Sequence, residues 1–154
     1  MPFDIVHSIT IKASPEKVFD ALTTKTGISG WWTKRNSARP KFGAVQQFKF
    51  DKWTTLTFRV DEFDPPRHVV WTALWVPDDW KGTAVTFDLD PVSDGVELFF
   101  MHSGFASQDG IYGITNYSWA QYIRSLKLFV EKGRGEAFGS RGSIACGTTP
   151  RKTG

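Results

Sequence analysis

The sequence has few residues that could build disulfides, metal sites or membrane spans. It has one cysteine, Cys146, so no disulfide can form within the chain, and an intracellular, cytoplasmic location is expected. Its three histidines, at positions 7, 68 and 102, lack the spacing of metal ligands. No apolar run reaches the roughly 18 residues of a membrane helix. The N-terminus also lacks the basic and apolar segments of a signal peptide. We therefore expect neither a metal nor a cofactor, and no membrane span.

Signatures of catalysis and phosphate binding are missing as well. Neither a Gly-x-Gly-x-x-Gly segment nor a P-loop occurs. His102 and Ser103 are neighbours in a predicted strand, so their side chains point to opposite faces and cannot act as a dyad. The sequence therefore favours a protein that is not an enzyme. A cyclase, dehydratase or hydrolase with His102, Tyr122 or Glu62 as acid–base groups is the alternative.

Charge is unevenly distributed along the chain. Residues 1–133 hold 15 Lys and Arg against 15 Asp and Glu, so the net charge of +3 lies entirely in residues 134–154. Because the domain itself carries no excess of positive charge, nucleic acid is not an expected partner. Residues 134–154 are rich in Gly, Ser, Thr and Arg, which predicts a disordered basic tail after a single domain at 1–133.

One stretch of that domain has no acidic residue. Between Asp20 and Asp51 lie six cations and no carboxylate, namely Lys25, Lys34, Arg35, Arg39, Lys41 and Lys49. One interpretation is a solvated loop. The other is an electropositive rim that attracts an anionic head group or an acidic partner.

What the chain has in abundance is aromatic residues, with seven Trp and 13 Phe. Many of them fall in segments where apolar and polar residues alternate, which is typical of strands with one wet face. The apolar positions of four such segments are Phe48 and Phe50; Leu56, Phe58 and Val60; Val85, Phe87 and Leu89; and Val96, Leu98, Phe100 and His102. Their hairpin spacing predicts an antiparallel meander of about six strands, counting the first at residues 3–13.

Helices are expected at three places. Ser14-Pro15-Glu16 has the residues of an N-cap and first turn, and a second short helix is predicted at 24–32, interrupted near Gly27 and Gly30. Apolar residues at helical spacing predict a long amphipathic helix at about 113–132. Since only this helix is long enough to cover the apolar face of the sheet, the fold class is α+β, with a curved sheet gripping one helix.

Several motifs occur in an order that resembles a known family. They are the segment ITIKASPEKVFDALT at 9–23, Trp31-Trp32, VDEFDPPR at 60–67, HSGF at 102–105, and Trp119 early in the last helix. The chain resembles the START-like (SRPBCC) helix-grip superfamily, in the branch named after the activator of the heat-shock protein 90 ATPase. That resemblance implies a deep pocket between helix and sheet. Members of the superfamily include lipid and polyketide binders, aromatase/cyclases, resistance proteins and chaperone co-activators.

The pocket is the predicted site, and we expect it to bind a small hydrophobic or aromatic ligand of lipid-like or polyketide-like character. Pockets of this kind are mostly apolar with a few placed polar groups. The candidate lining residues are Trp32, Phe48, Phe50, Phe58, Trp71, Trp75, Phe87, Phe100, His102, Trp119 and Tyr122. His102 has two interpretations, as a polar anchor for the ligand or as a structural histidine at the end of its strand.

A protein-interaction module is the third alternative, acting through the basic loop at 34–41 or the outside of the sheet. The resemblance implies a chaperone partner. Its eukaryotic members also use a separate N-terminal domain, so for this chain a chaperone is the less favoured expectation. Monomer and homodimer are both compatible with the sequence.

Overall fold

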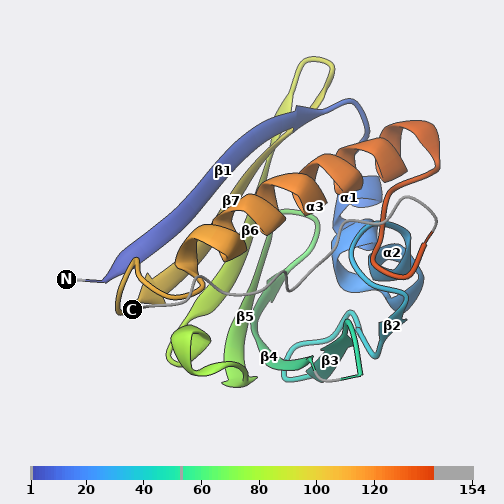
Figure 1. The fold of residues 1–154 in the computed structure, drawn as a ribbon. Coiled ribbons are helices and arrows are strands. Elements are labelled where there is room, and N and C mark those ends of the chain that lie inside the picture. The colour runs from blue at the N-terminus through green and yellow to red at the C-terminus, as the bar shows by residue number, and fades with distance from the viewer. Residues whose placement is uncertain (1, 53, 141–154) are drawn as a thin grey trace.

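The computed structural model describes residues 2–52 and 54–140. It contains a seven-stranded antiparallel sheet in the order β1-β7-β6-β5-β4-β3-β2 and one long helix along the concave face of that sheet (Figure 1). The strands are β1 (Phe3–Ile11), β2 (Arg35–Asn36), β3 (Val45–Lys49), β4 (Thr55–Asp64), β5 (His68–Trp75), β6 (Ala84–Val92) and β7 (Gly95–Phe105). The helices are α1 (Pro15–Thr23), α2 (Lys25–Trp31), the 3-10 turn η1 (Asp78–Trp80) and α3 (Tyr112–Lys132).

The α+β helix-grip prediction is confirmed, with one strand more than expected. The additional strand is β2, a two-residue strand that pairs with β3 at one edge of the sheet. Two residues are too few for an alternating pattern, so the sequence could not reveal this strand.

The entry into α1 follows the predicted chemistry. Ser14 has an extended backbone, and its hydroxyl accepts a hydrogen bond from the Lys17 amide at 3.2 Å. Pro15 occupies the first turn, where an amide N–H would have no partner in the helix. Val18, Phe19, Ala21 and Leu22 form the buried face, which fixes α1 over one end of the sheet.

The predicted interruption of the second helix is wrong, since α2 runs without a break from Lys25 to Trp31. Its glycines serve close packing instead. A Cβ atom at Gly27 would lie 2.6 Å from the Cα atom of Ala21, and one at Gly30 would lie 2.2 Å from the Phe129 ring. The two glycines therefore let α2 approach the backbone of α1 and the end of α3.

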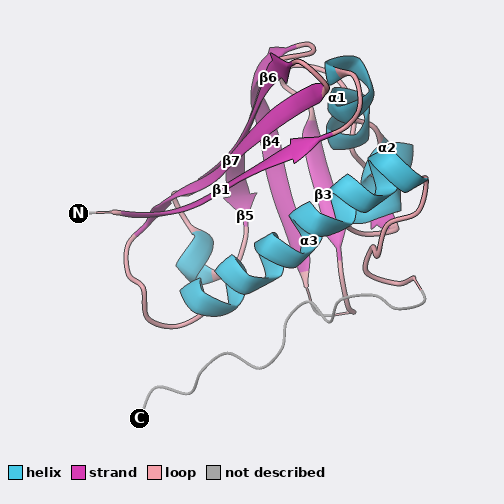
Figure 2. Cartoon of the chain, turned by 90° about the horizontal axis from the view of Figure 1, so that it is seen from above, coloured by secondary structure: helices cyan, strands magenta, loops and turns pink. Residues whose placement is uncertain are grey.

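The long helix α3 covers the concave face, as Figure 2 shows from above. Its buried side chains are Thr115, Trp119, Tyr122, Ile123, Ser125, Leu126 and Val130, and it ends at Gly133 with φ of 80°. The backbone of α3 comes closest to α2, β1 and α1, so side chains span the space between α3 and the middle strands. In the part of the chain that is described, no helix is long and apolar enough to cross a membrane.

The predicted disordered tail begins too early. Residues 134–140 pack against the domain, with Ala137 only 1% exposed. The Phe138 amide donates to the Trp32 carbonyl at 2.8 Å, and its own carbonyl accepts from the Lys34 amide. The Glu136 amide also donates a hydrogen bond to the hydroxyl of the buried Ser125, at 2.7 Å. The rest of the predicted tail, 141–154, lies outside the described residues.

Candidate functional site

The predicted site is the space between α3 and the concave face of the sheet. Strand alternation sends side chains of β3 to β7 inward, and the stripe of α3 faces them. Ten of the eleven predicted lining residues are buried there, each at most 2% exposed. They are Trp32, Phe48, Phe50, Phe58, Trp71, Phe87, Phe100, His102, Trp119 and Tyr122.

Trp75 is the exception, and the structure places it outside this space. Its side chain is 75% exposed. It is the last residue of β5, and the pairing of β4 with β5 shifts register just before it, between Thr57 and Phe58. Alternation alone cannot predict such a shift, because a β-bulge leaves the hydrophobic pattern almost unchanged.

The buried rings pack on one another across this space. Trp32 lies at the centre, with ring centroids 4.6 Å from Phe48, 5.0 Å from Trp119 and 5.8 Å from Trp71. Phe100 closes the set at 4.6 Å from Trp119. Aromatic pairs at these separations contribute about 0.5–1.5 kcal/mol each beyond the area they bury. The interior is therefore a continuous aromatic core.

Two tryptophans in this core were missed by the sequence analysis. Trp31 is fully buried, stacks on Trp32 at 5.9 Å, and donates its indole N–H to the Ala21 carbonyl. Trp80, in η1, lies edge-on to His102 at 4.7 Å. For Trp31, its position directly before the predicted lining residue Trp32 could have indicated that it is buried. Trp80 lies in a segment that reads as a loop, so nothing in the local pattern indicated its burial.

His102 is fully buried and both of its ring nitrogens have protein partners. The Trp119 indole N–H donates to Nδ1 at 3.0 Å, so Nδ1 carries no proton. Nε2 must then carry the hydrogen and donate to the Thr83 hydroxyl at 2.9 Å. Thr83 in turn donates to the Trp80 carbonyl at 2.6 Å, which completes a chain of hydrogen bonds from Trp119 to Trp80.

Burial lowers the pKa of His102 to about 3. The ring is therefore neutral near pH 7, in the tautomer that its partners require. A ligand that bonded to His102 would have to displace Trp119 or Thr83. The geometry is that of a structural histidine, and the anchoring role stays a prediction.

Two polar groups close to the predicted lining in sequence, Arg59 and Glu62, lie on the outside of the sheet. Arg59 is exposed and paired with Asp61. Glu62 lies 3.0 Å from Nε2 of His68, whose Nδ1 contacts Asp88. The Asp88 and Glu62 carboxylates outweigh the partial burial of His68 and raise its pKa. Neither Arg59 nor Glu62 can reach a molecule beneath α3.

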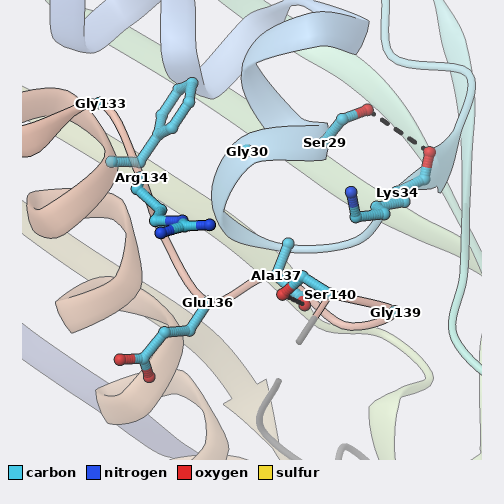
Figure 3. A pocket seen from close by; sticks show the side chains of 11 residues that line it. Ser29, Gly30, Lys34, Gly133, Arg134, Glu136, Ala137, Gly139 and Ser140 are labelled. Atoms are coloured by element: carbon cyan, nitrogen blue, oxygen red, sulfur yellow. Dashed lines mark hydrogen bonds between the residues drawn. The ribbon is translucent and has the colours of Figure 1, made fainter. Parts of the chain in front are cut away.

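Two concave sites on the surface adjoin the acid-free stretch. One, of about 810 Å³, lies between α2 and the chain that follows α3 (Figure 3). We call it the α2–α3 pocket, lined by Ser29, Gly30, Lys34, Phe129, Gly133, Arg134, Gly135, Glu136, Ala137, Gly139 and Ser140. Figure 3 shows the Lys34 ammonium and the Arg134 guanidinium extending from opposite sides toward the same space.

A neighbouring groove of about 390 Å³ shares Lys34 with that pocket. It is lined by the cations Lys25, Lys34, Arg35 and Lys49 and the polar residues Asn36, Ser37 and Gln47, and we call it the basic groove. Four of the six cations in the acid-free stretch therefore meet at one place. Within 2–52 and 54–140, no cluster of His, Cys, Asp or Glu could hold a metal ion, and Cys146 is outside those ranges.

A third concavity, of about 250 Å³, lies between β1 and α3 and includes His7, Ile9, Ile123 and Lys127 in its lining. The half-buried His7 ring stacks on Phe100 at 6.0 Å. Its Nε2 atom is buried without a hydrogen-bond partner among the described residues.

Comparison with known proteins agrees with the geometry. The chain is similar to the Aha1 dimer from Colwellia psychrerythraea, with 34% identity and a TM-score of 0.80, over 86% of this chain and 99% of that one. A Mesorhizobium loti protein has 26% identity and a TM-score of 0.74, over 84% and 98% of the two chains. A Bacillus halodurans protein shares the fold, with a TM-score of 0.71 at 20% identity over 84% and 97%. The search of curated proteins found no match.

The family model described as Activator of Hsp90 ATPase homolog 1-like protein matches residues 12–131, most of the domain. Together with the helix-grip fold, this match shows that the chain belongs to the family of Activator of Hsp90 ATPase homolog 1-like proteins.

Proposed function

We propose that the chain is a partner-binding protein that works through its surface, in the manner of an activator of an Hsp90-type ATPase. The observation that carries this proposal is the packing of the interior, in which the candidate lining residues contact one another. An aromatic core of this kind stabilises the domain and leaves recognition to the outside. The family description and the Aha1 relative name the class of partner to test first.

The test is a measurement of ATP turnover by the Hsp90-type chaperone of the source organism, with and without the purified chain. We expect turnover to rise with the concentration of the chain until it saturates, and sedimentation to show a complex. Sedimentation of the chain alone gives its oligomeric state, which matters because the Colwellia relative was solved as a dimer. Unchanged turnover together with no complex would refute the proposal.

Binding of a small apolar or aromatic ligand beneath α3 is the second candidate, and two observations favour it. Side chains alone separate α3 from the middle strands, so ring rotations could open space there. The unpartnered Nε2 of His7 also borders the concavity between β1 and α3, where a ligand could satisfy it. A buried polar atom without a partner costs about 1–3 kcal/mol, which a hydrogen-bonding ligand would recover.

Native mass spectrometry of gently purified protein tests this second candidate. A bound small molecule, together with quenching of tryptophan fluorescence in titrations with lipids, flavonoids and polyketides, would support it. His7→Leu should then weaken binding, whereas Val6→Ala, in the same strand but outside the lining of that concavity, should not. A protein that stays empty and unresponsive in both measurements would leave the surface function alone.

A further inference from the structure

The basic groove brings together four cations from three parts of the chain, none of them in an ion pair with a carboxylate of the described residues. Lys25 lies in α2, Lys34 and Arg35 lie at β2, and Lys49 ends β3. The surrounding polar side chains carry no charge, so the field of the groove is positive throughout.

Two of these cations oppose each other directly. Arg35 and Lys49 are register partners in the antiparallel pair of β2 and β3. Like charges in this position repel and destabilise a sheet. Since a carboxylate at either position would turn the repulsion into an attraction, stability alone does not account for two cations here.

Protection of the sheet edge does not account for them either. β2 is an edge strand, and charged side chains on an edge prevent it from pairing with another chain. Negative as well as positive side chains can protect an edge, although Lys is the most frequent choice. The stretch between Asp20 and Asp51 nevertheless uses positive charge at all six of its charged positions.

We propose that the basic groove is a docking surface for an acidic segment of a partner protein, an inference that rests on the proposed partner-binding function. Charge complementarity favours such an occupant, because the four exposed cations can each meet a carboxylate of an extended chain. The α2–α3 pocket continues the surface from Lys34 to Arg134. Its one carboxylate, Glu136, is already paired with Arg124 at 3.1 Å.

The probe is a fluorescein-labelled dodecapeptide of alternating Glu and Ser, with alternating Gln and Ser as its neutral counterpart. Fluorescence anisotropy at low and at physiological salt measures both affinities. We expect the acidic peptide to bind and the neutral one not to bind. Raising the salt should weaken binding, because exposed charges are screened over a Debye length of about 8 Å at physiological ionic strength.

A pair of matched variants locates the binding. The double variant Lys34→Glu/Arg35→Glu should bind the acidic peptide about tenfold or more weakly, because two exposed attractions become repulsions. Arg39→Glu with Lys41→Glu makes the same change in net charge within the same stretch but outside the groove. The affinity of that control variant for the acidic peptide should fall by no more than about twofold.

Lys49→Glu shows whether a loss of binding comes from a loss of folding. The new carboxylate lies opposite Arg35, so thermal stability should not fall while binding of the acidic peptide weakens. Equal losses in both double variants, or none in either, would overturn the docking surface. Tighter binding of single-stranded RNA or of anionic vesicles than of the peptide would also overturn it.

The ATPase measurement separates this inference from the function on which it rests. If the chaperone is stimulated equally by the wild type and by the Lys34→Glu/Arg35→Glu variant, the groove proposal is wrong and the partner function stands. If stimulation is absent while peptide binding depends on the groove, the chaperone proposal falls and the docking surface stands.

Discussion

The indole N–H of Trp119 in α3 donates to Nδ1 of His102 in β7 across 3.0 Å, with both side chains at most 2% exposed. This bond joins the long helix to the sheet through polar atoms inside an otherwise aromatic core. It also selects the tautomer of His102, so the hydrogen is left on Nε2 for Thr83.

Trp119→Phe should destabilise the domain by about 1–3 kcal/mol, because Nδ1 of His102 is left buried without a donor. The free energy of unfolding in urea measures the effect. Trp75→Phe is the matched control, since that side chain is 75% exposed and should change stability by less than about 0.5 kcal/mol. Equal effects at the two positions would show that the bond has no special weight.

The pKa values of His68 in β5 and His102 in β7 should be shifted in opposite directions. Burial lowers the pKa of His102 to about 3, so its ring should stay neutral, with the proton on Nε2, from pH 8 to about pH 4. His68 should take up its proton above the usual pH of about 6.5. Nitrogen-15 NMR of the imidazoles reports both events, and protonation of His102 near pH 6 would contradict the chain of hydrogen bonds from Trp119 to Trp80.

His68 should make stability depend on pH in a defined direction. Partial burial lowers its pKa, but the bonds to Asp88 and Glu62 raise it more, so the folded state binds the proton more tightly than the unfolded state. The added stability is fully present below the unfolded pKa of about 6.5 and is lost as pH rises through the folded pKa. His68→Gln should remove this dependence. A wild-type advantage that grows above pH 7 would contradict it.

Lys49→Glu should stabilise the domain by up to about 1 kcal/mol, because a like-charged pair with Arg35 becomes an opposite-charged pair. Lys49→Gln should have a smaller effect in the same direction, since it removes only the repulsion. Urea unfolding at low and high salt measures both, and salt should reduce the difference. A destabilised Lys49→Glu variant would mean that the two side chains do not interact as their register indicates.

Gly27→Ala should destabilise the domain by about 1–3 kcal/mol even though alanine is the better helix former. The new methyl group would lie 2.6 Å from the Ala21 Cα atom, and backbone cannot move aside as a side chain can. Gly113→Ala in α3 is the control, because no atom lies within 4 Å of its added methyl. That variant should gain up to about 1 kcal/mol, and similar results for both would place Gly27 in open space.

The order of strands and helices could be predicted from local pattern alone. Alternation along the segment from Val96 to His102 specifies a strand with one buried face, and Ser14-Pro15-Glu16 specifies where a helix begins. These signals act between neighbours in the chain, so a single sequence is enough to detect them. The inward direction of the strand residues in the predicted lining follows from the same alternation, and that of Trp119 and Tyr122 follows from the helical spacing of α3.

How the rings beneath α3 pack on one another was decided only by tertiary structure. It depends on how rings from separate elements, such as Trp32, Phe48 and Trp119, fit together in volume and orientation. The same holds for the basic groove, where residues from α2, β2 and β3 meet because a two-residue strand pairs with β3. Packing and charge clustering are properties of distances through space, and no local pattern in the chain contains them.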